Sequence, residues 1–62
     1  MDFEKLEQIR KDKGISVEEL AGKLGTHRST WYRWISGKRK NVSFENIKKA
    51  CEVLGVDIKD IL

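Results

Sequence analysis

Positive charge is concentrated in one short stretch of this 62-residue chain. Residues 1–26 hold six acids and five bases, and residues 41–62 hold four acids and three bases, so each flank has a net charge of −1. Between them lie five bases and no acid: Arg28, Arg33, Lys38, Arg39 and Lys40. Clustered cations bind polyanions, and an arginine can donate two hydrogen bonds to O6 and N7 of guanine. This stretch therefore favours nucleic-acid recognition over catalysis.

Residues 28–36 have two chemically different faces when they are drawn as a helix with about 100° per residue. The inner face contains Trp31 and Trp34, flanked by Thr30 and Ile35. The outer face is polar and cationic, and the residues on it that we expect to contact bases are Arg28, Ser29, Tyr32 and Arg33. The tryptophans could instead form an exposed platform for single strands, but their inner spacing favours a place in the core.

The polar residues in and around this helix differ in the contacts they can form. Both outer arginines are placed for bidentate contacts with guanine. Ser29 can bind a base edge or a phosphate, and Tyr32 can bind a phosphate or pack on a thymine methyl group. Phosphate contacts are also predicted from the amides that begin the preceding helix and from the basic loop over residues 38–42, through Lys38, Arg39, Lys40 and Asn41. That loop could alternatively serve solubility or nuclear localisation, and His27 could be a turn residue or a phosphate contact.

Residues 20–34 have the spacing of a helix-turn-helix, which would position the outer face. Its fixed positions are Leu20, Ala21, Leu24, Gly25, Trp31 and Trp34. Gly25 can adopt the left-handed conformation that ends the first of the two helices, and Ala21 is small where the helices would cross. Gly22 lies inside that first helix at a cost of about 1 kcal/mol, which only a close contact with a neighbour or a phosphate would explain.

Caps and glycines divide the whole chain into five predicted helices. The first spans residues 2–13 and stops at Gly14. The second follows a capping box in which Ser16 accepts from the amide of Glu19 while Glu19 reaches back, and it runs to residue 24. The third covers residues 28–36, and a short fifth begins at residue 57. The fourth is capped by Ser43, ends at Gly55 and has the apolar stripe Phe44, Ile47, Cys51 and Leu54.

Composition limits the remaining possibilities. A chain of 62 residues without proline is expected to form one all-α domain over residues 1–62, with no room for an effector domain. No signal peptide or membrane span is expected, and the lone Cys51 fits a reducing compartment, so the expected location is cytoplasmic. One His and one Cys cannot form a metal cluster. We therefore expect no enzyme activity, no cofactor and no small-molecule substrate.

From residue 3 to residue 62 the sequence resembles the Cro/C1-type (XRE-like) helix-turn-helix domain of phage repressors and their bacterial relatives. The shared motifs are residues 9–11, 19–25, 28–30, 37–38 and 50–56. The resemblance implies a compact five-helix lambda-repressor-like fold, binding to a double-stranded DNA operator, and usually a homodimer. By position it implies base contacts at Arg28, Ser29 and Arg33, with His27 and Tyr32 nearby. It implies phosphate contacts at Val17 and from Ser36 to Phe44.

Three positions depart from the family pattern. Val17 stands where a glutamine often contacts phosphate, so only backbone amides can make that contact. Ile35 stands where the family often has a glutamate paired with the arginine at the position of Arg10. Arg10 must therefore extend along the surface or find another acid. Trp31 and Trp34 replace branched aliphatic residues, which implies a bulkier core.

The sequence thus predicts a repressor-like transcriptional regulator that acts by occupying an operator. The alternative is a protein-binding module on the same fold, such as an antitoxin-like or adaptor domain, and a designed scaffold is a third reading. Exposed apolar residues on the outer face of residues 28–36 would favour a protein partner, whereas polar ones favour DNA. Val56, Ile58, Ile61 and Leu62 could form a dimer surface or simply close the core.

Overall fold

A computed structural model describes residues 2–37 and 42–62. These residues form four α-helices and one short 3₁₀ helix: α1 (Phe3–Asp12), α2 (Val17–Leu24), α3 (Arg28–Ile35), α4 (Phe44–Leu54) and η1 (Ile58–Asp60). The all-helical prediction is confirmed, whereas the prediction of five helices is wrong. The segment predicted as the fifth helix makes only a single 3₁₀ turn. Ile61 turns into the core, and its carbonyl accepts from the amide of Asp2 at 2.7 Å, so the chain leaves the helical path.

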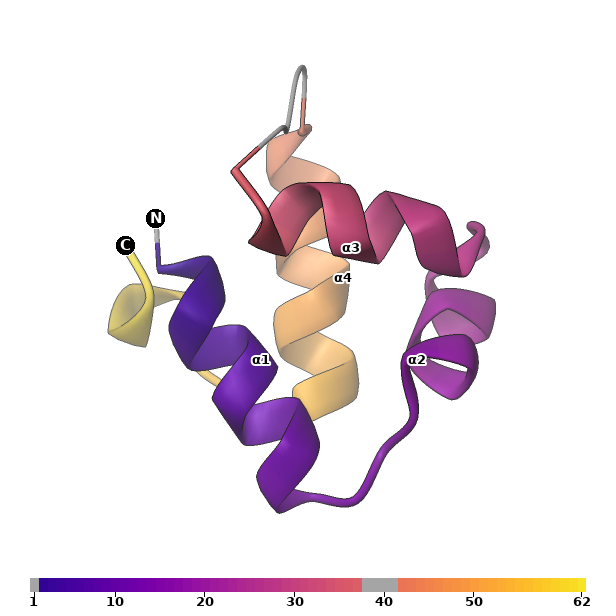
Figure 1. Cartoon of the computed structure of the whole chain (residues 1–62). Helices are drawn as coiled ribbons and strands as arrows, with labels where there is room; N and C mark the ends of the chain where they lie inside the picture. The colour runs from indigo at the N-terminus through magenta and orange to yellow at the C-terminus, as the bar shows by residue number, and fades with distance from the viewer. Residues whose placement is uncertain (1, 38–41) are drawn as a thin grey trace.

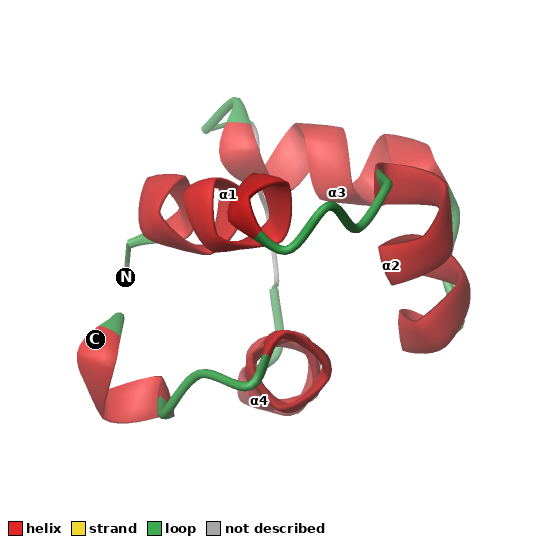
Figure 2. Ribbon diagram, turned by 90° about the horizontal axis from the view of Figure 1, so that it is seen from below, coloured by secondary structure: helices red, strands yellow, loops and turns green. Residues whose placement is uncertain are grey.

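Each of α1 and α2 packs against both α3 and α4. In Figure 1, α3 lies across the top of the domain, α1 and α2 lie below it on opposite sides, and α4 runs behind them. The 3₁₀ helix η1 packs against α4. Figure 2 shows α4 nearly end-on, with η1 beside it and the two chain ends on the same side. The helix-turn-helix pair α2–α3 is therefore held from behind by α1 and α4.

Every helix contributes to a single apolar core. Its fully buried large side chains are Trp31, Leu6, Leu20, Leu54 and Ile61. The predicted stripe of α4 is correct at Ile47, Cys51 and Leu54 but wrong at Phe44, which is 59% exposed. Phe44 is the first residue of α4, and the first turn of this helix extends past α3 in Figure 1. Ala50 takes the remaining buried position.

The helices begin and end largely where the sequence predicts, at capping hydrogen bonds and at glycine. Oγ of Ser16 accepts from the amide of Glu19 at 3.0 Å, and Oγ of Ser43 accepts from the amide of Asn46 at 3.1 Å. Among the described residues the reciprocal bond, from the amide of Ser16 to the Glu19 carboxylate, is not formed, so only half of the capping box is present. Gly25 has φ of +71° and ends α2 in the left-handed conformation, as predicted. Within residues 2–37 and 42–62, no helix is both long and apolar enough to cross a membrane.

Candidate nucleic-acid interface

The two faces of α3 are divided as the sequence predicts. Trp31 is 0% and Trp34 is 6% exposed, and Thr30 and Ile35 lie half-buried at the margin. The exposed residues of the opposite face are Arg28, Ser29, Tyr32, Arg33 and Ser36. Together with its C-cap residue Ser36, α3 therefore presents two guanidinium groups, two serine hydroxyls and one phenol to solvent. The alternative of an exposed tryptophan platform is wrong, because both indoles lie in the core.

Aromatic packing fixes the rotation of α3 about its own axis. The rings of Trp31 and Trp34 lie 6.0 Å apart at an interplanar angle of 57°, and those of Trp34 and Phe3 lie 6.1 Å apart at 54°. Tilted pairs at these distances are the favoured geometry for aromatic side chains. Because Phe3 belongs to α1, this chain of rings connects the buried face of α3 to the first turn of α1.

Hydrogen bonds to Glu7 of α1 also hold α3 in place. Oε1 of Glu7 accepts from Nε1 of Trp31 at 3.0 Å and from Nε of Arg10 at 2.5 Å. Arg10 also donates to the carbonyl of Ile15 at 2.6 Å, in the segment before α2. Glu7 is thus the acid that Arg10 finds in place of the family's glutamate. Sequence reasoning could not anticipate the contact between Glu7 and Trp31, because these two residues lie 24 positions apart.

The same contact shifts the pKa values of both charged groups. Burial is the largest single influence on Glu7 and raises its pKa, but the hydrogen bonds from Arg10 and Trp31 and the charges of Arg10 and Lys11 outweigh it. The pKa of Glu7 therefore lies below its ordinary value. The hydrogen bond to Glu7 raises the pKa of Arg10, so both partners stay charged at neutral pH.

His27 caps the start of α3, a role that the sequence prediction missed. Its Nδ1 accepts from the amide of Ser29 at 3.1 Å, and the hydroxyl of Ser29 lies 2.9 Å from the same nitrogen. Histidine is not among the preferred capping residues, so only its place directly before the helix could have indicated this. While its hydroxyl donates to His27, Ser29 can still accept a hydrogen bond from a base edge, but donating to one requires it to release His27.

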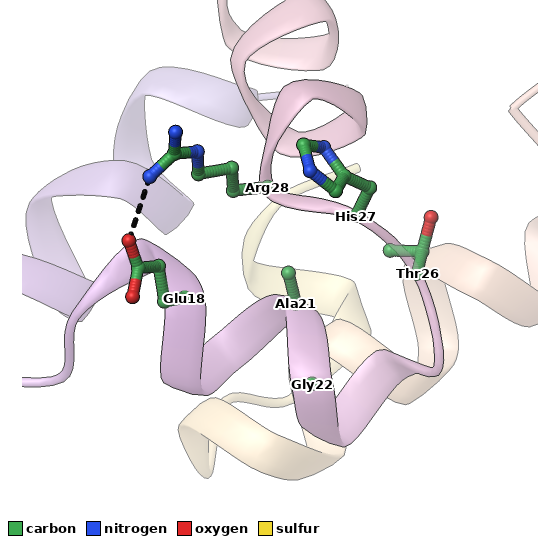
Figure 3. A pocket seen from close by; sticks show the side chains of 6 residues that line it. All are labelled: Glu18, Ala21, Gly22, Thr26, His27 and Arg28. Carbon is green, nitrogen blue, oxygen red and sulfur yellow. Dashed lines mark hydrogen bonds and ion pairs between the residues drawn. The ribbon is translucent and has the colours of Figure 1, made fainter.

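The two outer arginines have different surroundings. Arg28, the first residue of α3, donates from NH1 to Oε1 of Glu18 at 2.7 Å, and this pair links the starts of α2 and α3 (Figure 3). Arg33 is exposed and forms no ion pair with any described residue. Beside the ion pair of Arg28 and Glu18 lies a shallow hollow of about 260 Å³, lined by Glu18, Ala21, Gly22, Thr26, His27 and Arg28. Sequence reasoning did not single out Glu18.

The predicted phosphate contacts are scattered around α3. Val17 is buried, so only its backbone amide is available at the start of α2. Ser36 is exposed and donates to the carbonyl of Arg33 at 3.1 Å, and Phe44 and His27 are also exposed. The remaining predicted contacts, Lys38, Arg39, Lys40 and Asn41, lie outside the described residues.

No set of three or more potential metal ligands comes together among residues 2–37 and 42–62. Cys51 is buried in the core. Burial, followed by the negative charges of Asp57 and Glu52, raises the pKa of its thiol. The thiol is thus a packed core group in its protonated form.

Comparison with known proteins agrees with this geometry. The family model of the Cro/C1-type HTH DNA-binding domain matches residues 5–62. The chain belongs to this family. It is also 42% identical over 60 residues to Control protein C.BamHI of Bacillus amyloliquefaciens, an alignment that covers 95% of this chain and 73% of that protein. The chain is thus a DNA-binding transcriptional regulator, as its sequence predicts.

Proposed function

We propose that this Cro/C1-type regulator binds double-stranded DNA sequence-specifically as a single domain, with α3 in the major groove, and represses by occupying an operator. The observation that carries the proposal is the division of α3. Both tryptophans are buried, while the four proposed base-contacting residues lie exposed on the other side: Arg28, Ser29, Tyr32 and Arg33. A helix held by its apolar face and carrying exposed donors on the other suits the groove.

In this proposal the contacts divide between base edges and phosphates. Arg28 and Arg33 donate to guanine, Ser29 binds a base edge or a nearby phosphate, and Tyr32 packs on a thymine methyl group or binds a phosphate. The backbone amide of Val17 and the basic segment after α3 bind phosphates and set the register of the domain. Phosphate contacts of this kind are also assigned to Ser36, His27 and the start of α4.

A homodimer on a two-fold operator completes the proposal. One half-site would then lie about 34–36 Å from the other, which is one turn of DNA. Of the four apolar residues that the sequence analysis names at the C-terminal side, Ile61 is buried, and Val56 and Ile58 pack against the core. Leu62 is 71% exposed and is the part of that surface still available for a second copy.

The alternative of a protein-binding module gains little from the described surface. The outer face of α3 carries no exposed aliphatic residue, and Tyr32 is its one aromatic residue. A polar, cationic face of this kind fits a polyanion better than an apolar partner groove.

Selection from a pool of random duplexes tests the proposed function. We expect enrichment of a palindrome with two guanine-containing half-sites, whose retention falls steeply with salt. Retention of all duplexes without enrichment, or preference for single strands, would contradict the proposal.

A further inference from the structure

The ion pair between Arg28 and Glu18 contributes little to the fold. Its side chains are 57% and 72% exposed, respectively. Exposed pairs add little to folding stability, because water screens the charges and two long side chains must be ordered. The main effect of this pair is therefore on the position of the guanidinium. Figure 3 shows this group reaching from the start of α3 to the start of α2.

The surroundings of Arg28 make Glu18 its anchor. Among the hydrogen bonds of the described residues, the Arg28 side chain forms one, to Glu18. The adjacent part of the hollow belongs to Ala21 and Gly22, which offer no polar side chain. A Cβ at Gly22 would meet no described atom within 4 Å, so the space beside this residue is open. Without Glu18, the Arg28 side chain would lose its one hydrogen bond among the described residues.

The bond to Glu18 leaves most of the guanidinium available. A guanidinium carries five N–H donors, and this contact occupies one on NH1. Nε and NH2 form an edge with two parallel donors, which matches O6 and N7 of guanine. The carboxylate and a base can therefore bind Arg28 at the same time.

We infer that Glu18 is a specificity-determining positioning residue, which holds Arg28 so that its Nε and NH2 edge meets a guanine. The inference rests on the proposed function, in which Arg28 contacts a base. Glu18 also weakens binding overall, because its charge lies near DNA phosphates. Replacing Glu18 should therefore lower base preference while raising affinity for DNA in general. A residue with a purely structural role would not move these two quantities in opposite directions.

The experiment measures binding of the full chain to the selected duplex, to its single-base-pair variants and to unrelated DNA. Glu18→Ala removes the anchor, and Glu18→Gln keeps an uncharged acceptor of the same length. Glu19→Ala is the matched control, because Glu19 is an exposed neighbour of equal charge in the same first turn of α2. Circular dichroism confirms that each variant is folded.

We expect Glu18→Ala to reduce the preference for the guanine contacted by Arg28 about two- to tenfold, the cost of ordering one long side chain on binding. Its affinity for unrelated DNA should rise. Glu18→Gln should show an intermediate preference, and Glu19→Ala should raise affinity for all duplexes without changing preference. In an Arg28→Ala background, the effect of Glu18→Ala on preference should vanish.

Three outcomes would overturn the inference. Equal gains in affinity from Glu18→Ala and Glu19→Ala, with unchanged base preference, would mean that Glu18 affects binding only by repelling DNA phosphates. A sharper preference in Glu18→Ala would mean that Glu18 withholds Arg28 from DNA. A wild type that selects a sequence, but an Arg28→Ala variant with unchanged preference, would remove Arg28 as a reader while the proposed function stands on Arg33. Failure of the wild type to select any sequence would instead reject the proposed function itself.

Discussion

Arg33 is the simpler of the two arginines on the outer face of α3. Its side chain is exposed and forms no ion pair with a described residue, whereas Arg28 is bound by Glu18. A substitution at Arg33 therefore leaves no unpaired acid behind, and its effect on binding reports directly on the contacts of the guanidinium.

Arg33→Ala should lower discrimination at one base pair by about 1–3 kcal/mol, the contribution of one bidentate contact. Lys40→Ala should weaken binding to all sequences alike and reduce the salt slope by about one unit, as expected for a phosphate contact. The measurement is affinity across operator variants at several salt concentrations. Identical behaviour of the two variants would remove the distinction between base and phosphate contacts.

The residue-scale predictions succeed where the relevant signal is local. The period of Trp31 and Trp34 was enough to assign the faces of α3, and Ser43 could be recognised as a cap from its type and place. The contacts of Glu18 and Glu7 join residues 10 and 24 positions apart, so only the packing of helices reveals them. Phe44 was misplaced because periodicity cannot show where a neighbouring helix ends.

At the scale of elements, the position of α3 depends on its contacts with α1. The Glu7 carboxylate is the shared acceptor, and its pKa is lowered from the reference value of 4.5. A carboxyl group whose pKa is lower in the folded state stabilises the fold above its unfolded pKa. That stabilisation is lost as the pH falls through the folded pKa, below 4.5.

Glu7→Gln should lower the free energy of unfolding at neutral pH by about 1–3 kcal/mol, because it removes a charged hydrogen-bond acceptor for Trp31 and Arg10. The difference from wild type should shrink as the pH falls below 4.5. Urea unfolding followed by tryptophan fluorescence measures both effects. Glu4→Gln, at an exposed position of the same helix, is the control. A difference from wild type that is independent of pH would contradict the role assigned to Glu7.

Gly22 lies inside α2, where glycine weakens a helix. The structure shows no described neighbouring atom close enough to require glycine at this position. A Cβ there would meet no described atom within 4 Å, so we predict that Gly22 instead allows a phosphate of DNA to approach α2 closely. Gly22→Ala should stabilise the free protein by about 1 kcal/mol through helix propensity. It should also weaken binding to all DNA sequences alike.

The matched control for this substitution is Gly25→Ala, which should destabilise the protein because Gly25 has φ of +71°. Thermal unfolding and affinity for the selected duplex provide the two measurements. Stabilisation by Gly22→Ala without any loss of affinity would rule out the phosphate explanation.

At the scale of the whole molecule, the chain ends meet on one side of the domain. The amide of Asp2 donates to the carbonyl of Ile61 at 2.7 Å, and Leu62 follows with its side chain exposed. The sequence left open whether the C-terminal apolar residues close the core or form a dimer surface. Ile61 is buried and therefore closes the core. The structure of one chain does not show whether the exposed Leu62 contacts a second copy.

Leu62→Lys should therefore reduce affinity for the two-half-site operator much more than affinity for a single half-site. The physical reason is that a charge replaces an exposed apolar side chain on the proposed dimer surface. Binding to both duplexes and sedimentation of the free protein measure the effect. Equal affinities for wild type and variant on the full operator would place any dimer contact elsewhere.

On DNA, α3 should present its guanidinium groups to the bases while its indoles stay in the core. Nuclear magnetic resonance of the ¹⁵N-labelled protein, titrated with the selected duplex, tests it most directly. The Nε–H signals of Arg28 and Arg33 should shift strongly on binding, and the indole N–H signals of Trp31 and Trp34 should hardly move. Large indole shifts with unchanged arginine signals would rule out this orientation of α3 on DNA.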